Sequence, residues 1–178
     1  MQEGALELLD LLLDEYPSPI ELEMGYLLRA RCLESLGRLD DAVDSYHLAF
    51  QARRSNPSIR TYAPLEFGMF AIRQVRVDLY PEVQSAFNEL VEDNDLIFPD
   101  AQYMYFAANA MIAHKYGQKE MAQVYAKKAL QAADIDYSGS GRHPKLGLVE
   151  EHDENIERKL RKILNPGLLT LLNHAARN

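Results

Sequence analysis

The segment RARCLESLGRLDDAVDSYHLAFQARRSNP, residues 29–57, contains two helix-forming patterns separated by one glycine. Apolar residues recur three and four positions apart on both sides of Gly37, which is the spacing of helices with one buried face. Glycine easily takes the left-handed conformation that ends many helices, so Gly37 marks the turn. Ala42, Tyr46 and Ala49 follow it by five, nine and twelve residues. Since small side chains allow close approach, this pattern predicts a tight pair of antiparallel helices.

The same pattern returns elsewhere in the chain. AMIAHKYGQKEMAQVYAKKAL, residues 110–130, places alanines five, nine and twelve residues after Gly117. A third copy fits LEFGMFAIRQVRVDLYPEVQSAFNEL, residues 65–90, where no glycine marks the turn and Asp78 takes the equivalent place. The segment ALELLDLLLDEYP, residues 5–17, matches the second helix of one more unit. The return of one helix–turn–helix pattern along the chain predicts a helical-repeat fold.

Residues 5–135 resemble tetratricopeptide repeats in these features. The resemblance implies an all-α fold of antiparallel helix pairs, stacked as a short right-handed superhelix. About three and a half repeats would occupy residues 1–137, followed by a flexible loop at 138–148. Capping helices at 149–178 would complete the same domain. The repeat spacing exceeds the family's ~34 residues, so longer loops are expected, and the alternative is an irregular helical bundle.

Composition narrows the class of partner and compartment. The chain of 178 residues carries 19 Lys and Arg against 27 Asp and Glu, a net charge of −8. An acidic surface repels nucleic acid, which is bound through clustered cations, so we expect a protein partner instead. Cys32 is the only cysteine, and no basic, apolar leader opens the chain. We therefore expect a cytoplasmic protein that binds neither nucleic acid nor membrane.

By the resemblance, the first helix of each pair lines a concave groove that holds a protein segment. Co-chaperones of the family bind a terminal carboxylate with a lysine and asparagine clamp, and Leu27 and Arg31 stand in those places here. This departure argues against that activity. The residues expected to line an apolar groove are Met24, Leu27, Arg31, Glu34, Leu65, Ile72, Val75, Arg76, Met104, Met111, His114 and Lys115.

The N-terminal helix is leucine-rich on most of its faces. A helix that is apolar nearly all round needs to be covered, either by another subunit or by more of a longer solenoid. We expect self-association through residues 5–16, with Leu6, Leu9 and Leu13 as contact residues. A structural or oligomerising role in a larger assembly is therefore the alternative to a peptide-binding module.

The segment SGSGRHPKLGLVEEHDENIERKL, residues 138–160, combines a loop with a helix. Small residues and a His–Pro pair predict a flexible connector, and helical spacing begins at Val149. Acidic residues in the first turn and basic residues in the last turn suit the helix dipole. Arg142, His143 and Lys145 form a small cationic cluster, either a recognition loop or a set of charges paired with the scaffold's carboxylates.

A catalytic reading would make the chain a small hydrolase or metal-dependent enzyme. It would use His143 and His152 with Glu151, but their spacing matches no two-ligand helical motif. No phosphate-binding, dinucleotide-binding or nucleophile-elbow motif is present in the sequence. We therefore expect a non-catalytic protein without cofactor or metal that binds a protein or peptide.

Overall fold

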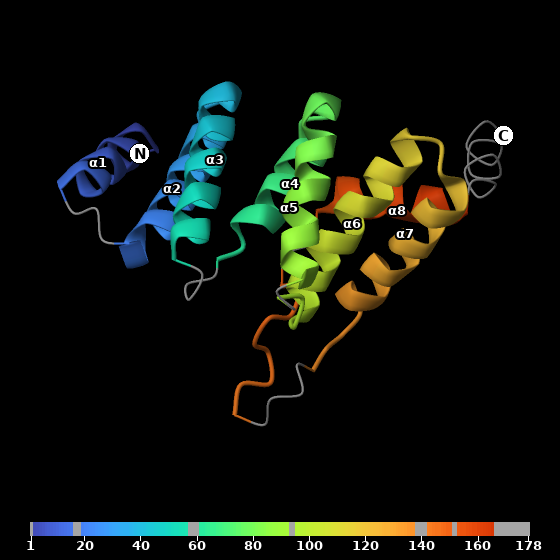
Figure 1. The fold of residues 1–178 in the computed structure, drawn as a ribbon. Coiled ribbons are helices and arrows are strands. Elements are labelled where there is room, and N and C mark those ends of the chain that lie inside the picture. Colours follow the sequence, from blue (N-terminus) through green and yellow to red (C-terminus); the bar gives the residue numbers. More distant parts are fainter. Residues whose placement is uncertain are drawn as a thin grey trace, which may run out of the picture. The chain divides into compact units, whose positions relative to one another are not determined.

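The computed structural model describes residues 2–15, 19–56, 61–92, 95–137, 142–150 and 153–165. Within these ranges every regular element is helical (Figure 1), which confirms the all-α prediction. The elements are α1 (Gln2–Glu15), α2 (Pro19–Ser35), α3 (Leu39–Ser55), α4 (Ala63–Arg73), the 3₁₀ helix η1 (Val77–Leu79), α5 (Tyr80–Glu92), α6 (Pro99–Lys115), α7 (Lys119–Ala133) and α8 (Glu154–Leu164). The chain forms two compact units, Met1–Phe67 and Gly68–Asn178. Their boundary lies within α4.

The turns after α2 and α6 have the same backbone geometry. Gly37 and Gly117 both have φ of +75°. The next amide in each turn donates back to the carbonyl five residues earlier, Arg38 N–H to Leu33 O and Gln118 N–H to Ala113 O, both at 2.9 Å. This bond satisfies a carbonyl that the helix end leaves without a partner. The predicted role of both glycines is confirmed.

The third turn has this geometry without a glycine. Val75 has φ of +55°, and the Arg76 N–H donates to Ala71 O at 2.9 Å. The left-handed position is therefore Val75, and the placement of Asp78 there was wrong by three residues. The 3₁₀ helix η1 lies between this turn and the start of α5, which accounts for the extra residues. The sequence pattern missed the turn because a β-branched residue rarely takes this conformation.

Replacing Val75 with glycine should stabilise the protein. A left-handed conformation costs a β-branched residue about 1–3 kcal/mol. Glycine avoids this cost, but it also raises the conformational entropy of the unfolded chain, which offsets part of the stabilisation. Val75 is 60% exposed, so its removal costs little buried surface. We expect Val75→Gly to raise the free energy of unfolding in urea by about 1 kcal/mol. Gly37→Val should lower it by a similar amount, and an unstable Val75→Gly variant would contradict this reading of the turn.

Large aromatic side chains fill the core of the first unit. The Phe67 ring, fully buried, lies 5.3 Å from the ring of Tyr46 and 5.4 Å from that of Phe50. Ala42 and Ala49 are also fully buried, as the repeat pattern predicted. Small side chains on α3 thus bring it close to α2, and the aromatic rings fill the remaining space.

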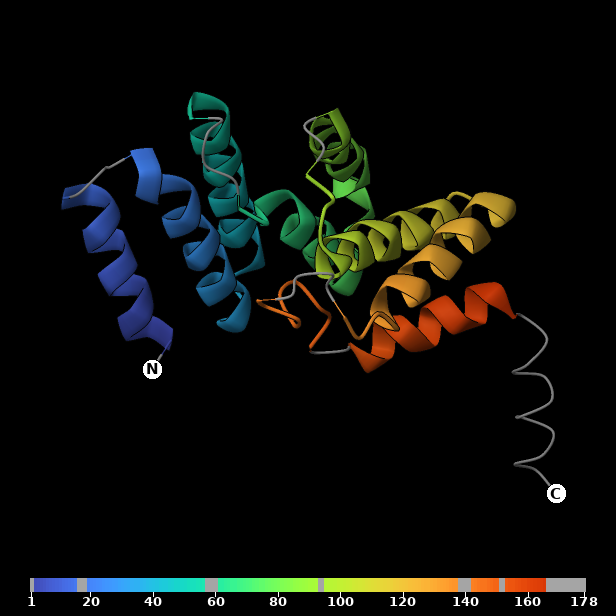
Figure 2. The same ribbon diagram turned by 90° about the horizontal axis from the view of Figure 1, so that it is seen from below.

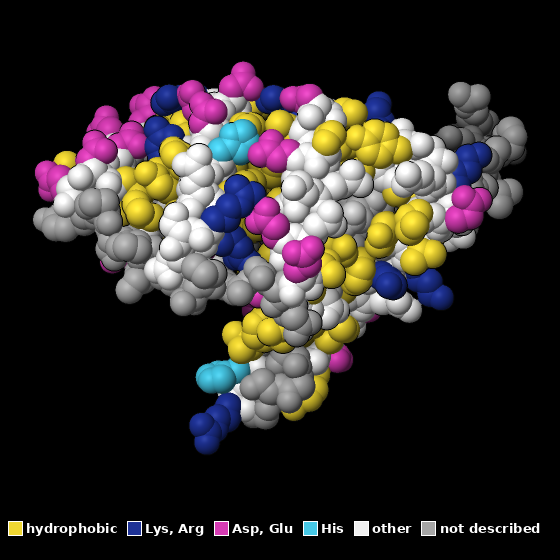
Figure 3. All heavy atoms as spheres, viewed as in Figure 1, with side chains coloured by type: hydrophobic (Ala, Val, Ile, Leu, Met, Phe, Trp, Pro, Cys, Tyr) yellow, Lys and Arg dark blue, Asp and Glu magenta, His cyan; other side chains and the backbone are white. Residues whose placement is uncertain are grey.

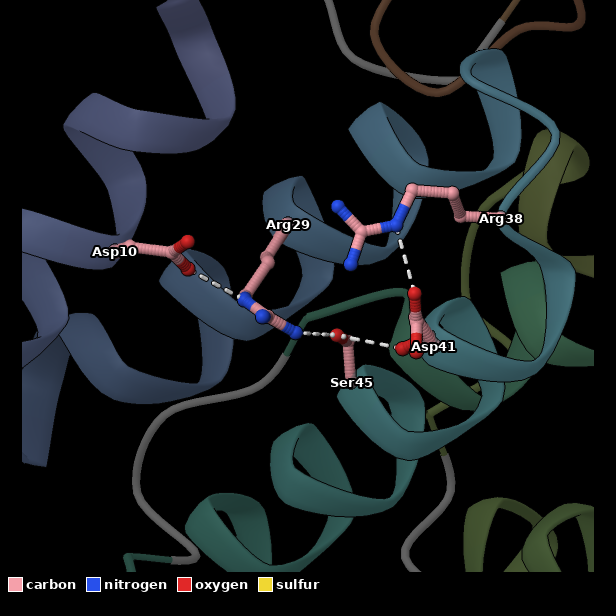
Figure 4. A network of polar contacts seen from close by, with 5 residues as sticks. All are labelled: Asp10, Arg29, Arg38, Asp41 and Ser45. Atoms are coloured by element: carbon pink, nitrogen blue, oxygen red, sulfur yellow. Dashed lines mark hydrogen bonds and ion pairs between the residues drawn. The ribbon is translucent and has the colours of Figure 1, made fainter. Parts of the chain in front are cut away.

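The contacts that hold helix α1 against α2 include an apolar and an ionic one. A Cβ added at Gly25 would lie 2.8 Å from Leu13 Cδ2, so the two helices meet where α2 has no side chain. Arg29 Nε donates to Asp10 Oδ1 at 2.6 Å, and Arg29 Nη1 donates to Ser45 Oγ at 2.6 Å. Figure 4 shows this guanidinium joining carboxylate and hydroxyl groups from the two neighbouring helices, α1 and α3.

A buried ion pair links α2, α3 and the segment that enters α4. Arg53 Nη1 lies 3.6 Å from Glu23 Oε1, and these side chains are only 6% and 2% exposed. The same carboxylate oxygen accepts the Thr61 hydroxyl at 2.7 Å and the Thr61 N–H at 3.3 Å. Burying two charges is costly unless they are paired and hydrogen-bonded, so these contacts fix the end of α3 relative to the start of α4.

The second unit depends on small residues at its helix contacts. A Cβ added at Gly68 would lie 2.4 Å from Phe87 Cζ, so α4 meets α5 at a glycine. Helices α6 and α7 pack against each other, and both have fully buried alanines, namely Ala107, Ala108 and Ala110 on α6 and Ala122, Ala126 and Ala129 on α7. Helix α8 lies against α7 and α6 (Figure 2) and buries Ile156, Leu160 and Ile163.

Helix α8 begins at Glu154, five residues later than the pattern predicted. Asp153 is its N-cap and accepts the N–H groups of Asn155 and Ile156 at 3.0 and 3.1 Å. The preceding segment stays non-helical because it docks on α6, where Asp100 N–H donates to Gly147 O at 2.8 Å. Val149 and Glu150 therefore precede the helix. Glu151, His152 and residues 166–178 lie outside the described residues, and the C-terminal part of the predicted capping region with them.

Candidate functional site

Three residues expected in the groove lie in the core instead. Leu27, Leu65 and Ile72 are 1%, 2% and 1% exposed. Each is covered by other parts of the chain, so it packs in the core and is closed to a partner. The periodicity that suggested these positions identifies an apolar face but does not say what covers that face.

Two charged residues expected in the groove, Arg31 and Glu34, already form hydrogen bonds with other residues of the chain. Arg31 donates to both carboxylate oxygens of Glu66, with Nε at 2.6 Å from Oε2. This hydrogen bond raises the pKa of the Arg31 guanidinium above its ordinary value. Glu34 Oε1 accepts the Tyr46 hydroxyl at 2.6 Å. These groups organise the first unit, and a partner would have to compete with the existing bonds.

Arg76 makes a comparable local contact in the second unit. Its Nη2 donates to Asp78 Oδ2 at 2.9 Å, and its Nε lies 3.1 Å from both carboxylate oxygens. The hydrogen bond from Arg76 lowers the pKa of the Asp78 carboxyl. This pair spans the start of η1, so Arg76 has a role in the turn after Val75.

The methionines among the predicted groove residues stay at least partly accessible to solvent. Met24 and Met104 each stand thirteen residues before a left-handed glycine, counting 24 to 37 and 104 to 117. Met24 is 45% exposed, and Leu28, one turn later on α2, is 37% exposed. Met104 and Met111 on α6 are half-buried. Figure 3 shows apolar side chains at the surface over α6 and α7.

We call Met104, Ala108, Met111 and Lys115 the α6 stripe. They follow one another at spacings of four, three and four residues, which places them on one face of the helix. Ala108 is fully buried, whereas the two methionines are half-buried and Lys115 is exposed. The accessible part of the stripe is therefore its two methionines, which flank the buried Ala108, and the cation at its end. His114 is exposed beside it, in the last turn of α6.

An aromatic row crosses α5, α6 and α7 in the second unit. The ring centroids of Phe87 and Tyr105 are 5.0 Å apart, those of Tyr105 and Phe106 5.2 Å, and those of Phe106 and Tyr125 6.2 Å. Lys128 Nζ lies 5.1 Å from the Phe106 centroid, within cation–π range. Burial raises the pKa of the Tyr105 hydroxyl, and Tyr125 adds to this effect. The sequence analysis did not identify this row, although the adjacent Tyr105 and Phe106 hinted at it.

Tyr103 marks the contact between α6 and α8. Its side chain is 4% exposed, and burial raises the pKa of its hydroxyl to about 12. The carboxylates of Glu157 and Asp153 on α8 shift that pKa in the same direction. Tyr103 therefore stays protonated at neutral pH and serves packing between the two helices.

The leucines of α1 divide into a packed set and an exposed set. Leu6 and Leu13, which were expected to mediate self-association, are 6% and 9% exposed because they pack within the chain. Leu9 is half-buried. The accessible residues are Leu8, Leu11 and Leu12, with 68%, 52% and 41% of their surface exposed. These three form the α1 leucine face.

The predicted recognition loop is on the surface of the second unit. Arg142, His143 and Lys145 are all exposed, and Arg142 and Lys145 form no ion pair with any residue in the described ranges. Gly147, with φ of +67°, anchors the loop, since an added Cβ would lie 2.5 Å from Phe98 Cβ. The catalytic alternative stays untested, because Glu151 and His152 lie outside the described residues.

Searches for known sites and relatives give no assignment. Among the described residues, no three His, Cys, Asp or Glu side chains lie together in a way that could hold a metal ion. None of the helices in those ranges combines the length and hydropathy needed to cross a membrane. No protein-family model, curated protein or solved structure matches the chain.

Proposed function

We propose that the chain is a non-catalytic, cytoplasmic protein-interaction module of tetratricopeptide-like helix pairs, which binds a segment of another protein along the α6 stripe. The observation that carries this proposal is the repeated methionine. The same position relative to the left-handed glycine holds a solvent-accessible methionine in both glycine-marked helix pairs.

The chemistry of the stripe suits an apolar helix or extended peptide. Methionine is unbranched and polarizable, so it adapts to partner side chains of different shapes. Met104 and Met111 remain partly accessible on either side of Ala108, which is fully buried and closed to a partner. Lys115 at the end of the stripe can donate hydrogen bonds to a carboxylate or a backbone carbonyl. Recognition by burial of apolar anchors at helical spacing is a common mode of peptide binding.

Site-specific crosslinking tests where a partner binds. A photoreactive benzophenone amino acid is placed at Met111, and in a matched variant at Met121, which is 50% exposed on α7. We expect a discrete crosslinked product in cell lysate from position 111 and none from position 121. Equal products from both positions would contradict binding at the α6 stripe.

A structural role in a larger assembly is the second candidate, and the α1 leucine face supports it. Contiguous leucines on a surface often mark a protein interface. Five carboxylates and no basic residue lie between residues 2 and 15, so two copies that paired through α1 would bring like charges together. Self-association through this face should therefore be weak at low salt and stronger when salt screens the repulsion.

Light scattering tests the second candidate. If copies pair through the α1 leucine face, the mass should rise with concentration, and more steeply at 0.5 M than at ~0.05 M salt. Leu8→Gln combined with Leu11→Gln should return the protein to a monomer without loss of helicity, because both side chains are exposed. Val124→Gln, at a residue 50% exposed on α7, is the matched control. A monomer under all conditions would remove this candidate.

A further inference from the structure

A cavity of about 450 Å³ lies in the second unit beside α8, and none of the proposed functions uses it. Arg73, from the last turn of α4, lines it together with Arg158, Lys159 and Lys162 of α8. Its volume is within the range of small-molecule sites, roughly 300–1,000 Å³. Four cations from two helices thus converge on one concave surface.

The charge of this cavity is opposite to that of the chain. Asp153 is the single carboxylate among the described residues of its lining, and its Oδ1 already accepts the N–H groups of Asn155 and Ile156. Within the described part of the chain, the lining therefore has four positive side chains against one negative side chain, in a protein whose net charge is −8. An anion entering the cavity would meet an excess of positive charge.

The cations of α8 that line the cavity differ from the one that does not. Arg161, outside the lining, pairs with Glu157 at 3.5 Å. Arg158 instead donates to the neutral amide oxygen of Asn155 at 3.3 Å. Among the described residues, none provides a carboxylate partner for Arg158, Lys159 or Lys162. Arg158 and Lys162 also stand four residues apart, where like charges destabilise a helix, so a bound anion would relieve their repulsion.

We propose that this cavity binds a ligand with clustered phosphate groups. Guanidinium groups match phosphate oxygens in pairs, and lysine ammonium groups add point charges around them. A single carboxylate would leave most of the positive charge uncompensated, whereas a tripolyphosphate group offers several negative charges within the same volume. Ile156 is the one apolar side chain that the described residues contribute to the lining, so recognition depends on the phosphate cluster and little on an attached ring.

Titration calorimetry with sodium tripolyphosphate at ~0.05 M salt, where charge interactions are little screened, tests the site. We expect saturable binding that weakens as salt rises. Arg158→Gln combined with Lys162→Gln should lower the affinity at least tenfold. The matched control, Arg161→Gln combined with Lys127→Gln, removes the same charge from exposed positions outside the cavity and should change the affinity less than twofold. Circular dichroism verifies that both variants keep their helices.

A second experiment distinguishes a soluble phosphate ligand from a lipid headgroup. Sedimentation with phosphatidylcholine vesicles, with and without a bisphosphorylated phosphatidylinositol, reports binding to a lipid headgroup. Tripolyphosphate binding without vesicle binding identifies a soluble ligand, and headgroup-dependent vesicle binding that the Arg158 and Lys162 variant loses identifies a lipid ligand. No binding of either probe, or an equal loss in the matched control, overturns the proposal.

Discussion

Arg53→Met is expected to lower the free energy of unfolding by about 3–5 kcal/mol, the cost of removing one partner from a buried ion pair. The substitution keeps an unbranched side chain at a residue that is 6% exposed, but it leaves the Glu23 carboxylate buried without the guanidinium. The remaining donors to that carboxylate include the hydroxyl and amide of Thr61, which cannot replace a positive charge. Urea denaturation followed by circular dichroism measures the loss.

The double variant Glu23→Met with Arg53→Met distinguishes the energetic effect of the ion pair from that of the packing around it. If the cost of the single variant comes from an uncompensated charge, removing both charges should recover much of the lost stability. Arg54→Met is the surface control, since Arg54 is the exposed neighbour of Arg53. A single variant as stable as the wild type would show that this pair does not hold α3 to the entry of α4.

Ile72→Asp is expected to unfold the second unit and not to act as a selective binding variant. Ile72 is 1% exposed on α4, and an isolated carboxylate in an apolar core is among the most destabilising changes known. We expect a loss of about 4 kcal/mol or more, measured by thermal and urea unfolding. Ile72→Val should cost only about 0.5–1.5 kcal/mol, because it keeps an apolar side chain of similar shape.

Met111→Asp is the control for Ile72→Asp, because it places the same charge at a more accessible residue. Met111 came from the same set of predicted groove residues, but it is half-buried on α6, so its charged variant should stay folded. A well-folded Ile72→Asp variant would contradict the core assignment of α4. It would also restore Ile72 as a candidate contact of the groove.

The helix pairs could be predicted from sequence where their turns have a local signature. Gly37 and Gly117 both adopt the left-handed conformation that their positions suggested, and the alanines that follow them are buried. Val75 takes the same turn without that signature. The repeat pattern therefore placed Asp78 in the turn, because valine is not a residue that signals a left-handed conformation.

The surface was harder to predict than the helices. Helical spacing identified apolar faces on α2, α4 and α6, but burial depends on which neighbour covers each face. Leu27 and Ile72 proved to be core residues, whereas Met24 stays exposed. In the same way, α1 has two apolar faces, and the sequence alone could not decide which of them packs on α2.

The basic cavity could not be found by reading along the chain. Arg158, Lys159 and Lys162 have the composition of an ordinary helix C-terminal half, where cations suit the dipole. Their relation to Arg73 depends on how α8 packs in the second unit, because the two segments are distant in sequence. The start of α8 was also misplaced, since the docking of Gly147 on α6 is a tertiary contact.

The most direct test of the proposed interaction module is quantitative affinity capture with a folded surface variant. Wild type, Met104→Glu combined with Met111→Glu, and the control Met121→Glu are compared in lysate of the source organism by mass spectrometry. We expect the wild type and the control to retain the same protein, and the α6 variant to lose at least nine-tenths of it. Binding along the α6 stripe would be contradicted if all three proteins retained that partner. It would also be contradicted if the wild type retained no protein.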